Sequence, residues 1–251
     1  MSYLGLEGRR ILVTGASSGI GRATAIEASR NGAILALSGR RDDALAETLA
    51  KLEGTGHVTH PYDLSDLDGI PDLVQRVADD LGGIDGIVHA AGIHSARPLR
   101  TIDAAHLDDV LRTNVSTAIL IAKGFRSKRV ARVDGSLVLL SSAVATRGQT
   151  GVAAYAASKG AISAVTKSLA SELLRDRIRV NCVEPGIVNT PLTTTLAASV
   201  GEAGWAAIEA DHPMGIGEPT DVAHAILYLL SSASRWVTGI SLPVDGGMSA
   251  R

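Results

Sequence analysis

The chain has 251 residues, of which 45% are hydrophobic and 20% are charged, and its formal net charge is -2. A chain of this length is long enough to bury a substantial core. This balance of hydrophobic and charged residues is ordinary for a globular protein and gives no footprint for nucleic acid or an anionic membrane, so we expect neither partner.

The single cysteine, Cys182, lies in an apolar run and cannot form an internal disulfide. This favours a reducing compartment. The N-terminal sequence MSYLGLEGRR lacks the charged-then-apolar order of a signal peptide. No stretch reaches the ~20 apolar residues that a membrane-spanning helix needs. We therefore expect a cytoplasmic protein.

Short apolar runs alternate with longer amphipathic stretches along the whole chain. The apolar runs predict buried strands at 11–13, 34–37, 84–89, 137–140, 178–183 and 240–244, with 57–62 as a weaker candidate. The amphipathic stretches predict helices at 20–31, 42–52, 67–81, 104–129, 152–175 and 220–231. Continuously apolar strands that alternate with helices indicate a doubly wound α/β fold, with a parallel sheet covered on both faces. Since no repeat or linker interrupts this pattern, we expect one domain over residues 1–251.

A glycine-rich turn, TGASSGIG, follows the first predicted strand and opens the first predicted helix. Its glycines allow a tight turn and a close approach of the backbone to a pyrophosphate, which the free amides of a helix N-terminus attract. The spacing is GxxxGxG rather than GxGxxG, but the strand–turn–helix context is the one that dinucleotide binding requires. We expect this turn to bind a dinucleotide through Gly15, Ser17, Ser18, Gly19, Ile20 and Gly21.

Tyr155 and Lys159 stand four residues apart in the sequence YAASK, near the start of the predicted helix 152–175. At this spacing the phenol and the ammonium share one helical face. A free phenol titrates near pH ~10, and a fixed cation beside it favours the phenolate and lowers its pKa. An isolated pair of this kind is typical of an ordinary helix surface, so the acid–base interpretation depends on the surrounding motifs.

TGASSGIG, followed about 140 residues later by YAASK, resembles the short-chain dehydrogenase/reductase family in its short, single-domain branch. Further family motifs match in order along the whole chain, ending with Val-Asp-Gly-Gly at 244–247. The resemblance implies a Rossmann fold of about seven strands, a nicotinamide cofactor and no metal. It also implies that the cofactor contacts Asp63, Leu64, Ala90, Gly92, Pro185, Gly186, Val188 and Thr190.

The resemblance assigns roles to four residues. Tyr155 is implied to give a proton to the carbonyl oxygen in reduction and to take it in oxidation, while Lys159 lowers the pKa of Tyr155 and holds the ribose hydroxyls. The family serine lies 13 residues before the tyrosine, which selects Ser142 over Ser141 as the residue that positions the substrate oxygen. The resemblance implies that Asn114 bends its helix and holds a water that relays protons to Lys159. Without the resemblance, Asn114 would be interpreted as an exposed or capping amide.

Residues at the end of the second predicted strand favour NADP over NAD. NAD-preferring relatives carry an acid at the position of Gly39, and NADP-preferring relatives carry a basic residue at the position of Arg40. A guanidinium binds a 2′-phosphate, whereas a carboxylate repels it. Arg40 and Arg41 are therefore expected at the cofactor, although both also fit as solvated charges at a helix entry.

The chain departs from the family pattern after the fourth strand, where His89-Ala90-Ala91-Gly92 replaces Asn-Asn-Ala-Gly. We expect His89 to tie neighbouring strands together rather than to act in catalysis. His94 is a candidate for the wall of the substrate pocket.

The segment 190–214 is expected to be irregular and to form a mobile lid over the substrate. Thr190 is implied to contact the nicotinamide carboxamide. Trp205 is expected either to cap the pocket or to pack on a helix.

We therefore predict an NADP-dependent oxidoreductase that interconverts a carbonyl and a secondary alcohol. The chain resembles 3-oxoacyl-[acyl-carrier-protein] reductases, and Lys128 and Arg129 stand where those enzymes carry basic residues for the carrier protein. A second such arginine is replaced by Ser171, which weakens that interpretation. The alternatives are an NAD-dependent dehydrogenase of a sugar derivative or polyol, and a catalytically silent regulator that binds the cofactor. A sugar-nucleotide epimerase is disfavoured, because such relatives use TGxxGxxG and a longer C-terminal region.

Two long predicted helices, 104–129 and 152–175, suggest an assembly. The second carries alanines around much of its circumference, a surface that suits a close symmetric contact between subunits. In relatives these helices pair across a two-fold axis and the C-terminal strand makes a second contact. We expect a homotetramer, with a dimer as the alternative.

Overall fold

A computed structural model describes residues 4–250, without the side chains of Leu192 and Ser199. Its centre is one seven-stranded sheet in which all neighbouring strands are parallel, in the order β3-β2-β1-β4-β5-β6-β7. The strands are β1 (Arg10–Thr14), β2 (Ile34–Gly39), β3 (Val58–Pro61), β4 (Ile84–His89), β5 (Ala131–Leu140), β6 (Ile178–Pro185) and β7 (Ser241–Val244). The predicted doubly wound α/β fold is therefore confirmed.

The central strands form where the sequence is apolar without interruption, because both faces of the sheet are covered. β5 begins six residues earlier than predicted. Ala131 already pairs with Ile84, and the register then shifts before Ser136 pairs with Gly86. Arg132, Val133 and Asp134 in between are exposed, which hides this part of the strand from an apolar-run prediction.

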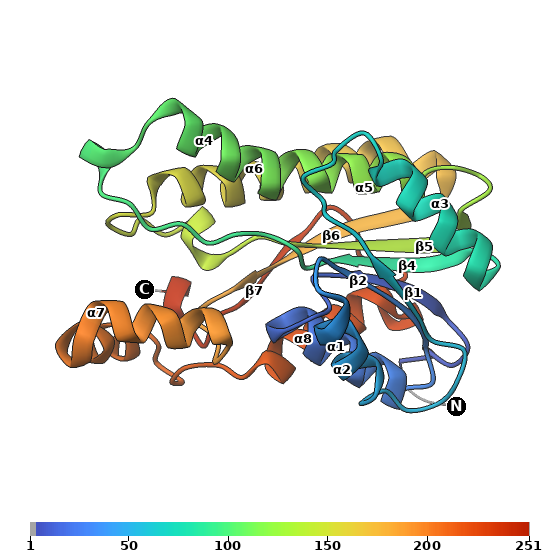
Figure 1. Ribbon diagram of the computed structural model, residues 1–251, viewed down its shortest axis with the longest axis horizontal. Helices are drawn as coiled ribbons and strands as arrows, with labels where there is room; N and C mark the ends of the chain where they lie inside the picture. The colour runs from blue at the N-terminus through green and yellow to red at the C-terminus, as the bar shows by residue number, and fades with distance from the viewer. Residues whose placement is uncertain (1–3, 251) are drawn as a thin grey trace.

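Helices cover both faces of the sheet (Figure 1). The face drawn uppermost carries α3 (Ile70–Leu81), α4 (Ala104–Leu111), α5 (Thr117–Phe125) and α6 (Ala153–Leu173). The opposite face carries α1 (Gly19–Arg30), α2 (Asp42–Leu49) and α8 (Pro219–Leu230). Two clusters of buried apolar side chains lie between these layers and the sheet, one on each face. Among the described residues, no helix joins the length and the apolar character needed to cross a membrane.

The predicted helix 104–129 is interrupted and shorter than expected. A π-helical turn over Arg112–Ser116 separates α4 from α5, and α5 ends at Phe125. Asn114 lies at the middle of that turn and is buried. A π-turn bulges the helix at this residue, as the resemblance implied.

The prediction that 190–214 is irregular is wrong, since most of it forms α7 (Pro191–Ala210). Thr190 caps the helix by accepting a hydrogen bond from the amide of Thr193, and Pro191 occupies the first turn, where its missing N–H costs nothing. The helix is broken only at Gly201, whose φ is 70°. α7 lies beyond the carboxyl edge of the sheet, apart from both helix layers (Figure 1).

Candidate active site

One large cavity of about 840 Å³ lies at the carboxyl edge of the sheet. The segments that follow β1 to β6 all contribute to its wall, which is where a doubly wound sheet presents its ligands. Every residue predicted to contact the cofactor lines this cavity: Gly15, Ser17, Ser18, Gly19, Ile20, Gly21, Arg40, Arg41, Asp63, Leu64, Ala90, Gly92, Tyr155, Lys159, Pro185, Gly186, Val188 and Thr190.

The glycine-rich turn exposes bare backbone to this cavity. Gly15 has a φ of 68°, and a Cβ there would lie 2.7 Å from the amide nitrogen of Ala91. A Cβ on Gly21 would collide with the carbonyl of Gly15, so the turn and the first turn of α1 pack without side chains between them. The helix N-terminus faces the cavity with its free amides, an arrangement that fits a pyrophosphate.

The far end of the cavity, beside β2, carries two cations. Arg40 and Arg41 are exposed and line the wall, next to Asp63 after β3. The backbone amide of Ser65 holds the pKa of Asp63 below its ordinary value, and the charge of Arg40 adds to this effect. Gly39 supplies no acid, and a Cβ there would meet its nearest neighbour, Leu45 Cδ2, at an ordinary 3.5 Å. This end of the cavity suits a ligand that carries an anionic group there better than one that carries only ribose hydroxyls.

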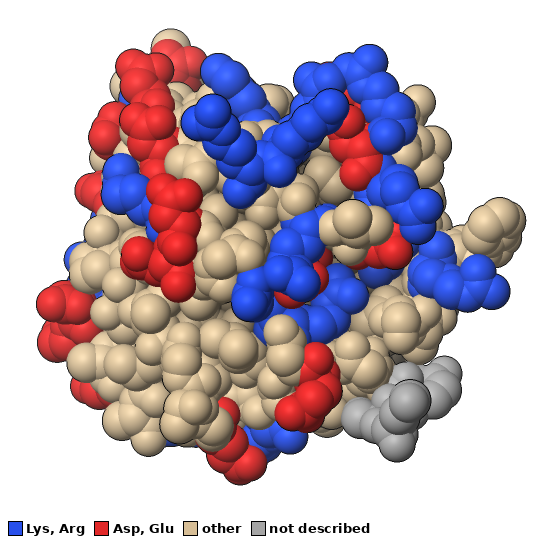
Figure 2. All heavy atoms as spheres, turned by 90° about the vertical axis from the view of Figure 1, so that its right-hand side faces the viewer, with Lys and Arg blue, Asp and Glu red and all other residues tan. Residues whose placement is uncertain are grey.

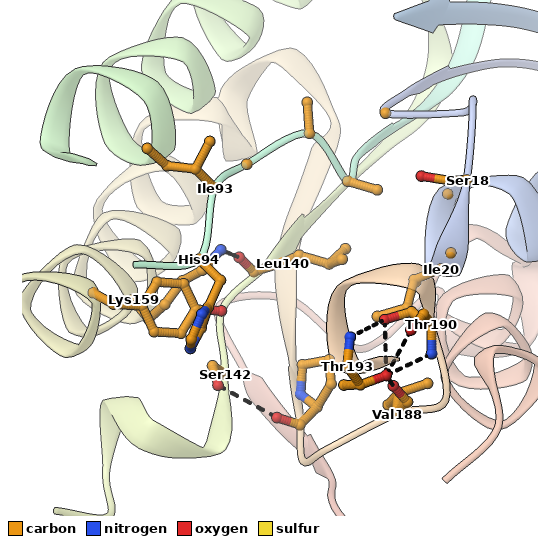
Figure 3. A pocket seen from close by; sticks show the side chains of 18 of the residues that line it. Ser18, Ile20, Ile93, His94, Leu140, Ser142, Lys159, Val188, Thr190 and Thr193 are labelled. Atoms are coloured by element: carbon orange, nitrogen blue, oxygen red, sulfur yellow. Dashed lines mark hydrogen bonds between the residues drawn. The ribbon is translucent and has the colours of Figure 1, made fainter. Parts of the chain in front are cut away.

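Tyr155 and Lys159 lie on the same face of α6, as their spacing predicts. The Lys159 ammonium is 5.5 Å from the centroid of the Tyr155 ring and donates a hydrogen bond to the Leu140 carbonyl at 2.8 Å. Figure 3 shows Lys159, His94 and Ser142 on one side of the cavity, opposite Ser18, Ile20 and Thr190.

The expected lowering of the tyrosine pKa is not found. Burial raises the pKa of Tyr155 to about 12, and a hydrogen bond with Ser142 opposes only part of that rise. Burial also lowers the pKa of Lys159 to about 8. The cost of removing the phenolate from water exceeds the attraction of an ammonium that is turned toward the Leu140 carbonyl. At neutral pH the phenol is therefore protonated, while Lys159 keeps most of its charge.

The two candidate serines are placed differently. The Ser141 hydroxyl is buried, donates to the Lys159 carbonyl at 2.8 Å and lies 2.9 Å from Ser163 Oγ, so it holds α6 against β5. The Ser142 hydroxyl instead donates to the Pro185 carbonyl at 3.5 Å, and it lies close enough to the Tyr155 phenol to oppose the rise in the pKa of Tyr155. The geometry thus brings Ser142 beside the tyrosine, the residue that the spacing selects.

Asn114 does not line the cavity. Its Oδ1 accepts from the Ile93 amide at 2.8 Å, and its Nδ2 donates to the Ile93 carbonyl and to Ser158 Oγ, each at 3.0 Å. The side chain therefore clamps the segment after β4 to α6. All three hydrogen bonds go to protein groups. The water relay to Lys159 that the resemblance implies for Asn114 remains a prediction.

His89 is buried and joins three elements. Its Nδ1 lies 2.8 Å from Thr14 Oγ1 on β1, and its Nε2 lies 2.9 Å from Thr117 Oγ1 on α5. Burial, with a smaller contribution from the Lys159 charge, lowers the pKa of His89 to about 3. A neutral ring that bridges two hydroxyls has the structural role expected from the sequence.

His94 lines the cavity with its ring edge-on to Tyr155, at a centroid separation of 4.8 Å. Burial lowers the pKa of His94 below its ordinary value, and the charge of Lys159 lowers it further. A neutral imidazole at this place offers a hydrogen-bonding nitrogen next to the phenol.

Several wall residues were missed by the sequence analysis. α7 contributes Leu196, Val200 and Ile208, and the loop before α6 contributes Gln149. Trp205 does not line the cavity; its indole nitrogen donates to the Glu209 carboxylate at 2.8 Å on the helix surface. The four-residue spacing of the first two apolar residues was the available signal for a helix here.

Comparison with known proteins finds relatives that match over nearly the whole chain. A family model described as enoyl-(acyl carrier protein) reductase matches residues 15–249. The 3-oxoacyl-[acyl-carrier-protein] reductase of Thermotoga maritima is 34% identical over 246 residues, which cover 97% of this chain and 98% of that protein. The gluconate 5-dehydrogenase of Gluconobacter oxydans is 33% identical, with 97% and 96% covered. The structure of a short-chain type dehydrogenase/reductase from Mycobacterium ulcerans matches with a TM-score of 0.92 at 29% identity, over 99% of this chain and 92% of that one.

Proposed function

The chain belongs to the short-chain dehydrogenase/reductase family of oxidoreductases, and we propose that it is an NADP-dependent member that interconverts a carbonyl and a secondary alcohol. The observation that carries this proposal is that Tyr155, Ser142 and Lys159 line one cavity together with the glycine-rich turn. Figure 3 shows Ser142 and Lys159 opposite Ser18 and Ile20 of that turn. NADP, when bound there, supplies or accepts the hydride.

The protein's own residues handle the proton. In reduction the carbonyl carbon receives the hydride, and its oxygen takes the proton of Tyr155, which is then restored from solvent. The high pKa of Tyr155 keeps the phenol protonated beforehand. Ser142 holds the substrate oxygen beside the phenol, and the charge of Lys159 favours the phenolate that forms. Oxidation of an alcohol runs the same steps in reverse.

Arg40 and Arg41 support NADP over NAD. Both side chains line the cavity beside β2, and Gly39 leaves the position of a competing carboxylate empty. A guanidinium gives the 2′-phosphate a charge-assisted hydrogen bond that a ribose hydroxyl cannot match.

The substrate is proposed to be a small molecule held under α7, which we take as the lid. The apolar side chains of Leu196, Val200 and Ile208 line the cavity from this helix. An alternative substrate is a hydroxylated molecule such as a sugar derivative or polyol, with NAD as cofactor. The likeness to a gluconate 5-dehydrogenase favours this alternative.

An acyl carrier protein is less well supported as a partner. Figure 2 shows basic side chains gathered on the face at the amino edge of the sheet. Lys128 and Arg129 follow α5 there, just before Val130, whose carbonyl accepts from the amide of Ile84 at the start of β4. The cavity lies at the opposite edge of the sheet, and neither Lys128 nor Arg129 lines it.

We also propose that the protein is a homotetramer. Leu107 and Leu111 on α4 are each 38% exposed, and Ile119 on α5 is 42% exposed. These apolar side chains lie on the helices that are expected to pair between subunits. The cytoplasmic location stays a prediction, which the burial of the unpaired Cys182 supports.

The proposed activity is tested with purified protein and matched cofactors. NADPH with a panel of ketones, and NADP with the corresponding alcohols, should give turnover that NADH and NAD support less well. Cofactor binding without turnover on any substrate would favour the silent regulator instead.

A further inference from the structure

A second, smaller cavity of about 60 Å³ adjoins the large one at the end of α7. Four residues line both cavities: Gln149, Ile187, Ile208 and Met248. The small cavity is therefore a side extension of the substrate region rather than a separate site.

Arg147 supplies a cation to this extension. One terminal nitrogen, Nη2, donates to the Asp211 carboxylate at 3.1 Å. The other, Nη1, is buried and has no hydrogen-bond partner among the described residues. A buried charged donor without an acceptor is costly, and it is most favourably satisfied by an anionic oxygen.

His212 and Asp211, which also line the small cavity, are already engaged. His212 accepts a hydrogen bond from the Ile187 amide at 3.0 Å through Nε2, and its Nδ1 lies 2.7 Å from the Ile208 carbonyl. Asp211 is 56% exposed and is paired with Nη2. Among the described residues that line this cavity, Arg147 Nη1 is thus the buried side-chain donor left for a ligand.

Arg147 also lies at a suitable place relative to the proposed chemistry. It follows Ser142 across the short helix Ala143–Ala145, and its amide donates to the Ala143 carbonyl at 3.0 Å. One helical turn therefore separates the arginine from the serine that holds the reacting oxygen. The small cavity, which Arg147 lines, extends from the large cavity, which Ser142 lines.

We propose that Arg147 binds the carboxylate of the substrate, so that the enzyme acts on an oxo acid and the corresponding hydroxy acid. This inference rests on the proposed function. A carboxylate fits a cavity of this size and accepts the hydrogen bond that Nη1 offers. Thioesters and other masked acids lack that charge and are expected to be poorer substrates.

The experiment compares an oxo acid with its methyl ester at equal chain length. Wild type is expected to prefer the acid in kcat/KM by about ten- to a hundredfold, the contribution of one charge-assisted hydrogen bond. Arg147→Met should abolish most of this acid-to-ester ratio, and Arg147→Lys should keep part of it. Asp211→Asn should keep or raise the ratio, because it removes a carboxylate that competes for the guanidinium.

Binding gives a readout that does not need turnover. Calorimetric titration of the hydroxy acid and its ester into the protein with bound NADPH should show the same ratio, and the same loss in Arg147→Met. If Arg147 only ties the end of α7 through Asp211, Arg147→Met will lower kcat/KM and binding for the acid and the ester alike and leave their ratio at the wild-type value, which overturns the inference. Equal binding of acid and ester by wild type overturns it as well. If the enzyme turns over the ester and shows no preference for the acid, the carboxylate site is rejected but the proposed activity stands. If the protein binds the acid preferentially but turns over no carbonyl compound, the proposed activity is rejected.

Discussion

The substitution Gly39→Asp, alone and together with Arg40→Leu, is expected to turn the cofactor preference from NADP toward NAD. The structure accommodates the new side chain, because a Cβ at Gly39 would lie 3.5 Å from Leu45 Cδ2 and 3.6 Å from Ser17 Oγ. The carboxylate would then share the cavity wall with the site proposed for the 2′-phosphate.

The size of the change follows from two contributions. Two unit charges about 4 Å apart interact by about 1 kcal/mol in water and by about 4 kcal/mol at an effective dielectric constant of about 20. Arg40 and Arg41 are exposed, so we take about 1–2 kcal/mol for the repulsion between the introduced carboxylate and the phosphate. Loss of one charge-assisted hydrogen bond from Arg40 adds about 1.5–3 kcal/mol. The double variant should therefore change the NADP-to-NAD ratio of kcat/KM by about a hundredfold to a few thousandfold.

The assay is the kcat/KM for each cofactor at saturating substrate, with Gly39→Asn as the matched control of equal size and no charge. The control should change the ratio far less than Gly39→Asp. A wild type that already uses NAD as well as NADP refutes the reasoning, and so does a control that behaves like the acid.

Three further predictions address the chemistry, the core and the assembly. Tyr155→Phe should keep the fold and cofactor binding but lose turnover by several orders of magnitude; comparable turnover on any substrate would remove Tyr155 from the mechanism. Because the pKa of His89 is about 3 in the folded protein and about 6.5 when unfolded, its contribution to stability is complete above pH ~6.5 and declines as the pH falls toward 3. His89→Asn should therefore be less stable at pH 8 but lose less stability between pH 6.5 and 4, measured by denaturant titration; equal pH slopes would contradict a buried neutral ring. Light scattering at micromolar concentration should give four times the chain mass, and a mass near 25.9 kDa would exclude the proposed tetramer.

The positions of residues that directly follow a strand could be predicted from the sequence. β4 matches its predicted bounds because Ile84 to His89 is an apolar run between turn signals. In a parallel sheet the segments after such strands meet at one edge. The glycine-rich turn, Ser142 and Pro185 therefore came together in one cavity without any knowledge of their side-chain contacts.

The lid escaped prediction because its local signals are weak. Thr193, Thr194 and Thr195 have low helix propensity, and Gly201 breaks the periodicity. The capping box pairs Thr190 with a threonine rather than with the usual Glu or Gln. The side chains of α7 that line the cavity, Leu196, Val200 and Ile208, are identified only when the chain is folded.

Properties that depend on burial could also not be predicted from the sequence. The spacing of Tyr155 and Lys159 predicts their proximity, but the sign of the tyrosine pKa shift depends on how much water the fold removes from each. The free nitrogen of Arg147 is a similar case. Whether an arginine finds one acceptor or two depends on Asp211, which is 64 residues away in the chain.

The strand order has a consequence for how the protein is made. β1 lies between β2 and β4, yet β1 ends at Thr14 and β4 begins only at Ile84. At a synthesis rate of about 5–20 residues per second, the inner edge of β1 stays unpaired for several seconds on the ribosome. β4 must in turn wait for β5, whose main pairing begins at Ser136. Unpaired apolar edges of this kind are aggregation-prone, so the strand order exposes β1 and β4 to aggregation until the later strands have been synthesised.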